Sequence, residues 1–60
     1  MSLENITRIR TVGHDSYFRP IIVVTFQCRD GSELEYEYSG GDAVDILAGE
    51  DPADYQGERL

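Results

Sequence analysis

Hydrophobic and polar positions follow the clearest pattern between residues 21 and 38. The first half of this stretch is β-branched and aromatic (IIVVTFQC), and the second half alternates acids with Leu or Tyr (SELEYEY). The turn-forming residues Arg29, Asp30 and Gly31 lie between the two halves. Two strand-like runs joined by a short glycine-containing turn predict a β-hairpin.

The side chains of the two arms indicate the register of this hairpin. A two-residue Asp30-Gly31 loop would place Phe26 opposite Glu35, and acids would then lie on the apolar face. A three-residue loop over 29–31, with Gly31 in the left-handed conformation, brings apolar residues together instead. The resulting pairs are Phe26 with Leu34, Val24 with Tyr36, and Ile22 with Tyr38. We therefore predict the three-residue loop.

The opposite face of the hairpin combines aliphatic residues with a row of acids. Acids spaced two apart on a strand lie ~6.6 Å from one another in a straight row, so they do not converge on a divalent ion. One interpretation is a solvated face balanced by Arg8 and Arg10. A mixture of aliphatic and acidic side chains also suits an interface. The residues predicted to bind a partner are Ile21, Val23, Glu33, Glu35 and Glu37 of this face, together with Tyr38 at the end of the second arm.

The segments before the hairpin predict a lead-in, a strand and a connection. Residues 1–5 form the lead-in, and the next apolar residues, Ile6, Ile9 and Val12, recur at a spacing of three. That spacing fits a helix or a bulged strand, and the Thr and Ile content favours the strand. The connection over 13–20 is rich in turn residues, and we expect Tyr17 and Phe18 to fold back over one end of the core.

The segment after the hairpin predicts a short helix. Asp42 is a suitable N-cap, Gly49 is a suitable stop, and the helix is expected over 42–48. Its apolar stripe is expected to be Val44, Leu47 and Ala48, with Ile46 at the edge. A second helical start is expected at Asp51 and Pro52, with Asp51 as the cap.

Together these segments predict an α+β fold in a single small domain, residues 1–60. The expected sheet is an antiparallel three-stranded β-meander of residues 5–12, 20–28 and 32–39. One short C-terminal α-helix, residues 42–48, is expected to pack on its inner face. A core this small usually needs additional stabilisation, and the single Cys28 cannot form an internal disulfide, so self-association as a homodimer is expected.

Charge narrows the function classes. The chain carries twelve acids, five arginines and no lysine, for a net charge of −7. This balance disfavours binding to nucleic acid phosphates or anionic lipid. It is also typical of proteins adapted to high salt, in which charge repulsion is screened. No apolar run approaches the ~20 residues that span a membrane, so we expect a cytoplasmic protein without a membrane segment.

Candidate catalytic groups are sparse. His14 and Asp15 are adjacent, but neighbouring residues rarely point together, and no nucleophile motif accompanies them. Cys28 shares the face of Phe26, which predicts a buried thiol. The Gly40-Gly41 pair precedes a helix, but nearby acids would repel an anion. We expect no enzyme, no metal and no cofactor.

Two tyrosines on one strand face, Tyr36 and Tyr38, are either core residues or a platform for stacking RNA bases. Around them the chain resembles the KTSC domain, which occurs alone in bacteria and at the C-terminus of some lysyl-tRNA synthetases. The residues that carry the resemblance are Gly13-His14-Asp15, Val24, Phe26, Gly31, Tyr36, Tyr38, Val44, Leu47 and Tyr55. The resemblance implies single-stranded RNA as a ligand and points to the tyrosine pair as important.

Three hypotheses for function follow. The leading one is a small acidic interaction module, without enzymatic activity, that associates with itself or with another protein. The second is a single-stranded RNA-binding module that uses Tyr36 and Tyr38. The third is an acidic decoy in which Glu33, Glu35 and Glu37 imitate a nucleic acid backbone and block a basic partner.

Overall fold

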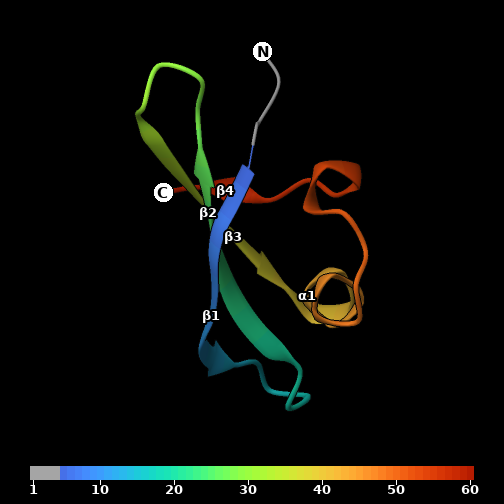
Figure 1. Ribbon diagram of the computed structural model, residues 1–60. Coiled ribbons are helices and arrows are strands. Elements are labelled where there is room, and N and C mark those ends of the chain that lie inside the picture. The colour runs from blue at the N-terminus through green and yellow to red at the C-terminus, as the bar shows by residue number, and fades with distance from the viewer. Residues whose placement is uncertain (1–4) are drawn as a thin grey trace.

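A four-stranded antiparallel sheet with one α-helix forms the protein, an α+β fold, in a computed structural model that describes residues 5–60 (Figure 1). The strands follow one another across the sheet in chain order. Their bounds are β1 Asn5–His14, β2 Pro20–Gln27, β3 Glu33–Ser39 and β4 Glu58–Arg59, and the helices are α1 Gly40–Leu47 and the 3₁₀ turn η1 Pro52–Asp54. Of the expected lead-in, residues 1–4 lie outside the described residues.

The β2–β3 hairpin has the predicted register. Phe26 pairs with Leu34, Val24 with Tyr36 and Ile22 with Tyr38, so the apolar residues of both arms share one face. Cys28 and Ser32 close the loop: the Cys28 N–H donates to the Ser32 carbonyl at 2.8 Å, and the Gly31 N–H donates back to the Cys28 carbonyl at 3.0 Å. Gly31 has a φ of +91°, the left-handed conformation that the three-residue loop requires. The prediction is confirmed.

Strand β1 is longer than predicted and contains two irregularities. It continues to His14, two residues past the predicted end, because Gly13 and His14 still pair with Ile21 and Pro20 of β2. Register shifts occur between Ile6 and Arg8 and between Thr11 and Gly13. These bulges explain the three-residue spacing of its aliphatic side chains, and the prediction of a bulged strand is confirmed.

Helix α1 begins earlier than predicted and turns a different face to the sheet. It starts at Gly40 directly after β3, with Ser39 rather than Asp42 as its N-cap, and Asp42 lies in the first turn. Ala43 and Ile46 are buried against the sheet, so the predicted stripe of Val44, Leu47 and Ala48 is wrong, and these three residues are exposed. No loop residues separate β3 from α1, so the last residues of β3 set the rotation of the helix.

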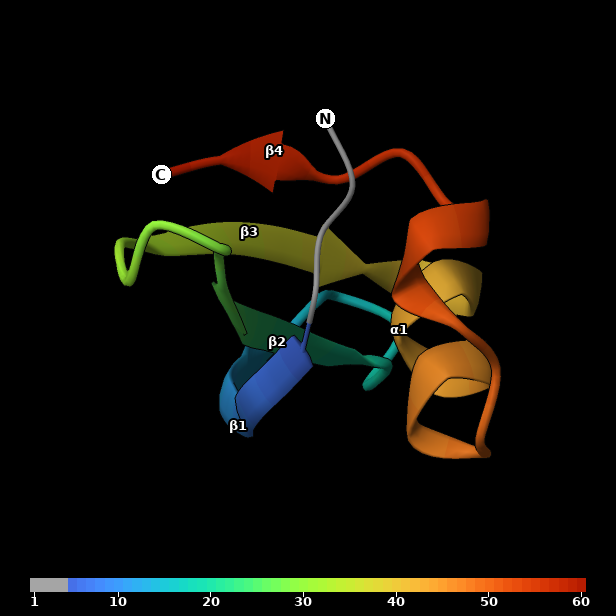
Figure 2. The ribbon, with the colours of Figure 1, turned by 45° about the horizontal axis from the view of Figure 1, so that its top comes forward.

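The end of the chain returns to the sheet. Asp51 caps η1 as predicted, since its carboxylate accepts the Ala53 N–H at 2.9 Å and Pro52 occupies the first turn. The fourth strand, β4, was not predicted; it pairs with β3 through Tyr36 and Glu37 (Figure 2). The helix is therefore not the C-terminal element, and the predicted three-strand meander is corrected to four strands.

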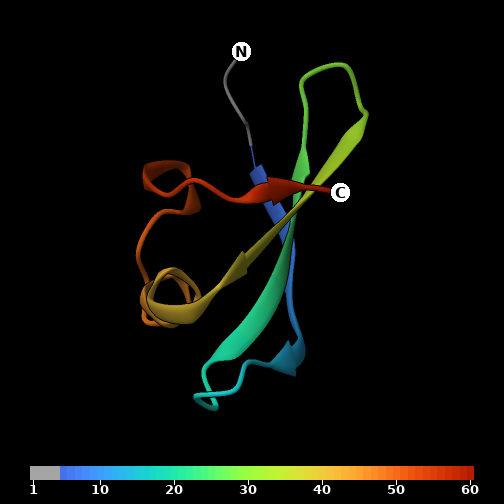
Figure 3. The same ribbon diagram turned by 180° about the vertical axis from the view of Figure 1, so that it is seen from behind.

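The core lies between α1, η1 and the side of the sheet that faces them, here called the inner face (Figure 3). Its buried members are Ile22, Val24, Phe26, Tyr38, Ala43 and Ile46. The cover is uneven, because α1 packs on β2 and β3 and leaves β1 largely open. Within residues 5–60, no helix has the length and apolar character needed to cross a membrane.

Candidate interaction surface

The outer face of the sheet, opposite α1, is more closed than the sequence predicted. Val23 and Thr25 lie at its centre on β2, and both are buried. Their cross-strand neighbours are Arg10 and Glu37 for Val23, and Arg8 and Glu35 for Thr25. The long stems of these charged side chains cover the small β2 side chains while their charged ends stay in water.

Polar contacts on this outer face join β1 to the acidic row. The Arg10 guanidinium lies 3.9 Å from a Glu35 carboxylate oxygen, and the Thr25 hydroxyl donates to the same oxygen at 3.3 Å. Both charged side chains are about half exposed, so the ion pair is worth less than ~1 kcal/mol. Thr7, Arg8, Thr25, Glu33 and Glu35 line a shallow polar hollow of about 230 Å³ beside it.

The six residues predicted to bind a partner therefore have different environments. Val23 and Tyr38 are buried: Val23 is not on an open face as expected, and Tyr38 is a core residue, one of its two interpretations. Ile21, Glu35 and Glu37 are partly buried, and Glu33 is exposed. The face does bring the three acids into one row, and it places arginines beside them, as the solvated interpretation expected.

The tyrosine pair belongs to the core. Tyr38 is the more deeply buried of the two, and its hydroxyl donates to the Pro52 carbonyl at 3.2 Å. Burial, assisted by the neighbouring Tyr36 and Asp51, raises the pKa of Tyr38. Tyr36 packs edge-on against Phe26, with ring centroids 5.8 Å apart and an interplanar angle of 82°. Tyr38 is thus buried, and Tyr36 is partly buried against the core.

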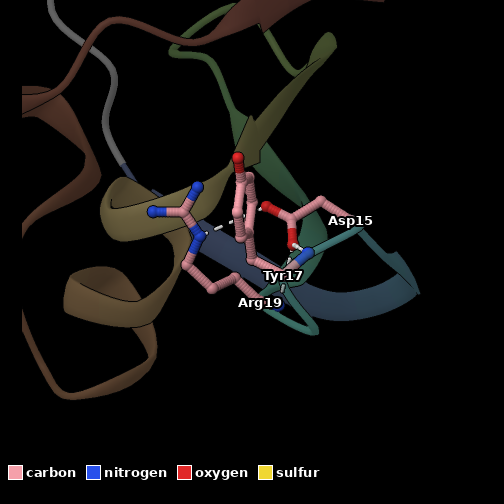
Figure 4. A network of polar contacts seen from close by, with 3 residues as sticks. All are labelled: Asp15, Tyr17 and Arg19. Atoms are coloured by element: carbon pink, nitrogen blue, oxygen red, sulfur yellow. Dashed lines mark hydrogen bonds and ion pairs between the residues drawn. The ribbon is translucent and has the colours of Figure 1, made fainter.

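The exposed aromatic residues lie instead in the loop that joins β1 to β2, here called the aromatic loop, residues 15–19 (Figure 4). Tyr17 and Phe18 are 76% and 87% exposed, so the prediction that they fold over the core is wrong. Phe18 has a φ of +62°, a left-handed conformation that costs a non-glycine residue ~1–2 kcal/mol. Such strain persists only where the surroundings enforce it.

Asp15 and Arg19 hold the aromatic loop in shape. The Asp15 carboxylate accepts the backbone N–H groups of Tyr17 and Arg19, each at 2.9 Å, and lies 3.3 Å from the Arg19 guanidinium. These contacts, chiefly the Arg19 backbone N–H, lower the pKa of Asp15. The Arg19 guanidinium also lies 5.3 Å from the centre of the Tyr17 ring, as Figure 4 shows. The loop is thus fixed with its aromatic side chains outward.

The sequence carries a signal for the shape of this loop but not for its direction. An Asp at the first position of a turn commonly accepts, through its carboxylate, backbone N–H groups of residues that follow it in the turn, which is an Asx-type arrangement. It predicts a fixed turn at Asp15. The exposure of Phe18 could not be inferred from it, because the direction of the loop depends on where β1 ends.

Aliphatic side chains of β1 form a second exposed apolar area. Ile6, Ile9 and Val12 are 39–47% exposed. At the start of β1 a hollow of about 360 Å³ opens between the sheet and the segment that leads into η1. It is lined by Asn5, Ile6, Phe26, Gly49, Glu50, Asp51, Pro52 and Ala53.

The groups considered for catalysis are not assembled. Asp15 is engaged with Tyr17 and Arg19, while His14 is exposed. Cys28 is a free thiol and is half-buried rather than buried. Within the described part of the chain, no three His, Cys, Asp or Glu side chains converge in a way that could hold a metal ion.

Comparisons with protein-family models, with curated proteins and with solved structures found no match. The resemblance to the KTSC domain stays a prediction.

Proposed function

We propose that this chain is a small acidic interaction module, without enzymatic activity, that associates with a second copy of itself. The observation that carries the proposal is the division of its apolar residues between core and surface. Seven apolar residues are buried in the described chain, and eight large ones are exposed. The exposed set is Ile6, Ile9, Val12, Tyr17, Phe18, Val44, Leu47 and Leu60. Five of these eight residues lie on β1 or in the aromatic loop that follows it, and neighbouring exposed apolar residues are typical of interaction surfaces.

The size of the core supports self-association. A chain of 60 residues has a free energy of unfolding of roughly 3–9 kcal/mol at ~0.05–0.15 kcal/mol per residue. Association of native copies adds to this stability by mass action, because the unfolded chain does not take part. Burial of exposed aliphatic and aromatic side chains between two copies supplies the favourable free energy.

Sedimentation equilibrium over a range of protein concentrations tests the proposal. We expect a dimer at micromolar concentrations, and we expect it to be tighter at 1 M salt, where the Debye length falls to ~3 Å from ~10 Å at 0.1 M. The reason is that each copy carries a net charge of −7, and salt screens their repulsion. A monomer mass up to high micromolar concentration at both salt levels would contradict self-association.

The two other hypotheses have less support. RNA binding through Tyr36 and Tyr38 would require stacking on rings of which Tyr38 is buried and Tyr36 is partly buried, and the net charge opposes a phosphate backbone. The acidic decoy keeps its row of acids, but Glu35 already contacts Arg10 and Thr25. Reversal of the charges of Glu33 and Glu37 tests the decoy, which predicts loss of captured basic proteins. Self-association predicts that the dimer persists in that variant and is at least as tight, because two charge reversals change the net charge of each copy from −7 to −3 and lower their repulsion.

A further inference from the structure

Strand β1 is the one long edge of the described sheet. The strand order places β1, with ten residues, at one edge and β4, with two, at the other. Ten residues of strand extend ~33 Å, close to the 38 Å length of the molecule. An edge strand exposes a row of unpaired N–H and C=O groups and can pair with another strand, whereas a two-residue edge offers almost no ladder.

The apolar side chains of β1 are arranged symmetrically. Ile6 and Val12 each lie three residues from Ile9, and all three are similarly exposed. A second β1 that runs antiparallel through Ile9 therefore places Ile9 beside its own copy and Ile6 beside Val12. The bulges flank this centre and leave 8–11 as the regular ladder, which confines a partner strand to the middle of β1.

The distribution of charge along the chain also favours association through β1. Residues 5–29 hold four arginines and one acid, a net of +3, whereas residues 30–60 hold ten acids and one arginine, a net of −9. Because β3, α1 and β4 all belong to the acidic half, an approach through β1 keeps the two acidic halves apart. On β1, the Arg10 guanidinium lies 3.9 Å from the Glu35 carboxylate of its own chain, and this pair reduces the repulsion between Arg10 and the arginines of a second copy.

Two complementary features lie at opposite ends of β1. The aromatic loop follows the end of the strand, and the 360 Å³ hollow beside Ile6 opens at its start. Antiparallel pairing brings each loop next to the hollow of the other copy, because the end of one strand lies beside the start of the other. The loop and the hollow are on the same side of the sheet, since the Arg19 guanidinium lies against Gly40 at the start of α1 and Phe26 of the inner face lines the hollow.

We infer that two copies pair antiparallel through β1 about a two-fold axis at Ile9, and that Tyr17 and Phe18 of each copy cover the hollow beside Ile6 of the other. The inference rests on the proposed function and names its surface. A stable interface of ~800 Å² per partner is roughly a fifth of the 4203 Å² surface of the chain. The ladder over 8–11, the exposed aliphatic side chains of β1 and two reciprocal loop contacts make up this interface.

Cysteine cross-linking tests the two-fold axis. In a Cys28→Ser background, Ile9→Cys places two thiols side by side across the axis, within the Cα separation of a disulfide. Val44→Cys is the matched control, because Val44 is similarly exposed and lies on α1 away from β1. We expect Ile9→Cys to form the disulfide dimer after mild oxidation and Val44→Cys to stay largely monomeric.

The solution mass of the wild-type protein, taken with the cross-linking result, distinguishes failure of the β1 interface from failure of self-association. A dimer in which Ile9→Cys does not link, or links no better than Val44→Cys, would overturn the β1 interface and leave self-association in place. A monomer mass would overturn both, and the β1 edge would then be available to a strand of another protein. Preferential linking through Ile9→Cys supports both.

The loop contact has its own test, which does not depend on the folding of the cysteine variants. We expect Phe18→Ala to raise the dimer dissociation constant about tenfold or more, as truncation of a buried aromatic anchor does. Leu47→Ala removes another exposed apolar side chain, on α1, and should change the constant less than about twofold. Equal effects of the two substitutions would refute the loop contact.

Discussion

The rotation of α1 can be tested with two neighbouring residues of the same helix. Ile46 is 4% exposed and packs in the core, whereas Leu47 is 50% exposed. Ile46→Ala removes buried groups and leaves a cavity, a change that typically costs ~2–5 kcal/mol. The better helix propensity of Ala returns at most ~0.7 kcal/mol. Leu47→Ala should change the free energy of unfolding by less than about 1 kcal/mol, since half of the side chain is already in water.

Urea unfolding followed by circular dichroism measures both effects. The total free energy of unfolding is roughly 3–9 kcal/mol, so Ile46→Ala should lower the urea midpoint markedly or leave the chain partly unfolded without denaturant. Leu47→Ala should unfold near the wild-type midpoint with an unchanged slope. Both variants should be compared at one low protein concentration, because association adds to apparent stability. A larger loss for Leu47→Ala would mean that the helix presents the stripe that sequence periodicity predicts.

Three further predictions concern the turns and the tyrosines. Gly57→Ala should lower the free energy of unfolding by ~1–3 kcal/mol, because a Cβ at this position would lie 2.8 Å from the Tyr38 ring. Thermal unfolding measures this loss, and an unchanged midpoint would contradict the prediction. Partial burial, the hydrogen bond from its hydroxyl to Asp45 at 3.0 Å and nearby acids raise the pKa of Tyr55 from 10.0 to about 12. The folded state therefore favours the protonated phenol, and the stability that this group contributes is full below pH 10 and is lost as pH rises toward 12. Phenolate absorbance should show that Tyr55 titrates late, as Tyr38 does, and Asp45→Asn should reduce the shift of Tyr55. Phe18→Gly should leave the monomer equally stable or up to ~1 kcal/mol more stable, because relief of the left-handed backbone strain at this position offsets or exceeds the entropy that a glycine loses on folding. A clear loss of thermal stability in dilute protein would show that Phe18 packs on its own chain.

Local chemistry made several features predictable. The three-residue loop of the hairpin follows from the alternation of apolar and acidic residues and from Gly31, since a shift of one residue would move acids to the apolar face. The cap at Asp51 follows from Pro52 in the first turn. The bulged character of β1 follows from its three-residue apolar spacing. In each case the residues that decide the structure are close in sequence.

The face of α1 was not predictable in the same way. Ala43 with Ile46 and Val44 with Leu47 are both apolar pairs at a spacing of three, so periodicity cannot distinguish between two neighbouring stripes. The direct junction of β3 with α1 makes the choice. Strand β4 was missed for a related reason: two residues carry no pattern, and they pair with β3 only because η1 turns the chain back across the sheet.

Candidate partner residues depended most strongly on tertiary structure. From the sequence, Ile21 and Val23 belonged to an open outer face, and Tyr17 and Phe18 belonged to the core. The structure reverses the roles of Val23 and of the aromatic pair, because long side chains from β1 cover the centre of the outer face while the fixed loop at Asp15 turns the aromatics outward.

The sequence by itself therefore determined the α+β class, the hairpin and its register, the acidic balance and the turn signals, all of which depend on neighbouring residues. Tertiary structure alone decided which apolar residues outside the inner face of the hairpin are buried. Burial depends on which strands lie side by side and on which face a helix turns to them, and those contacts join residues that are distant in the chain.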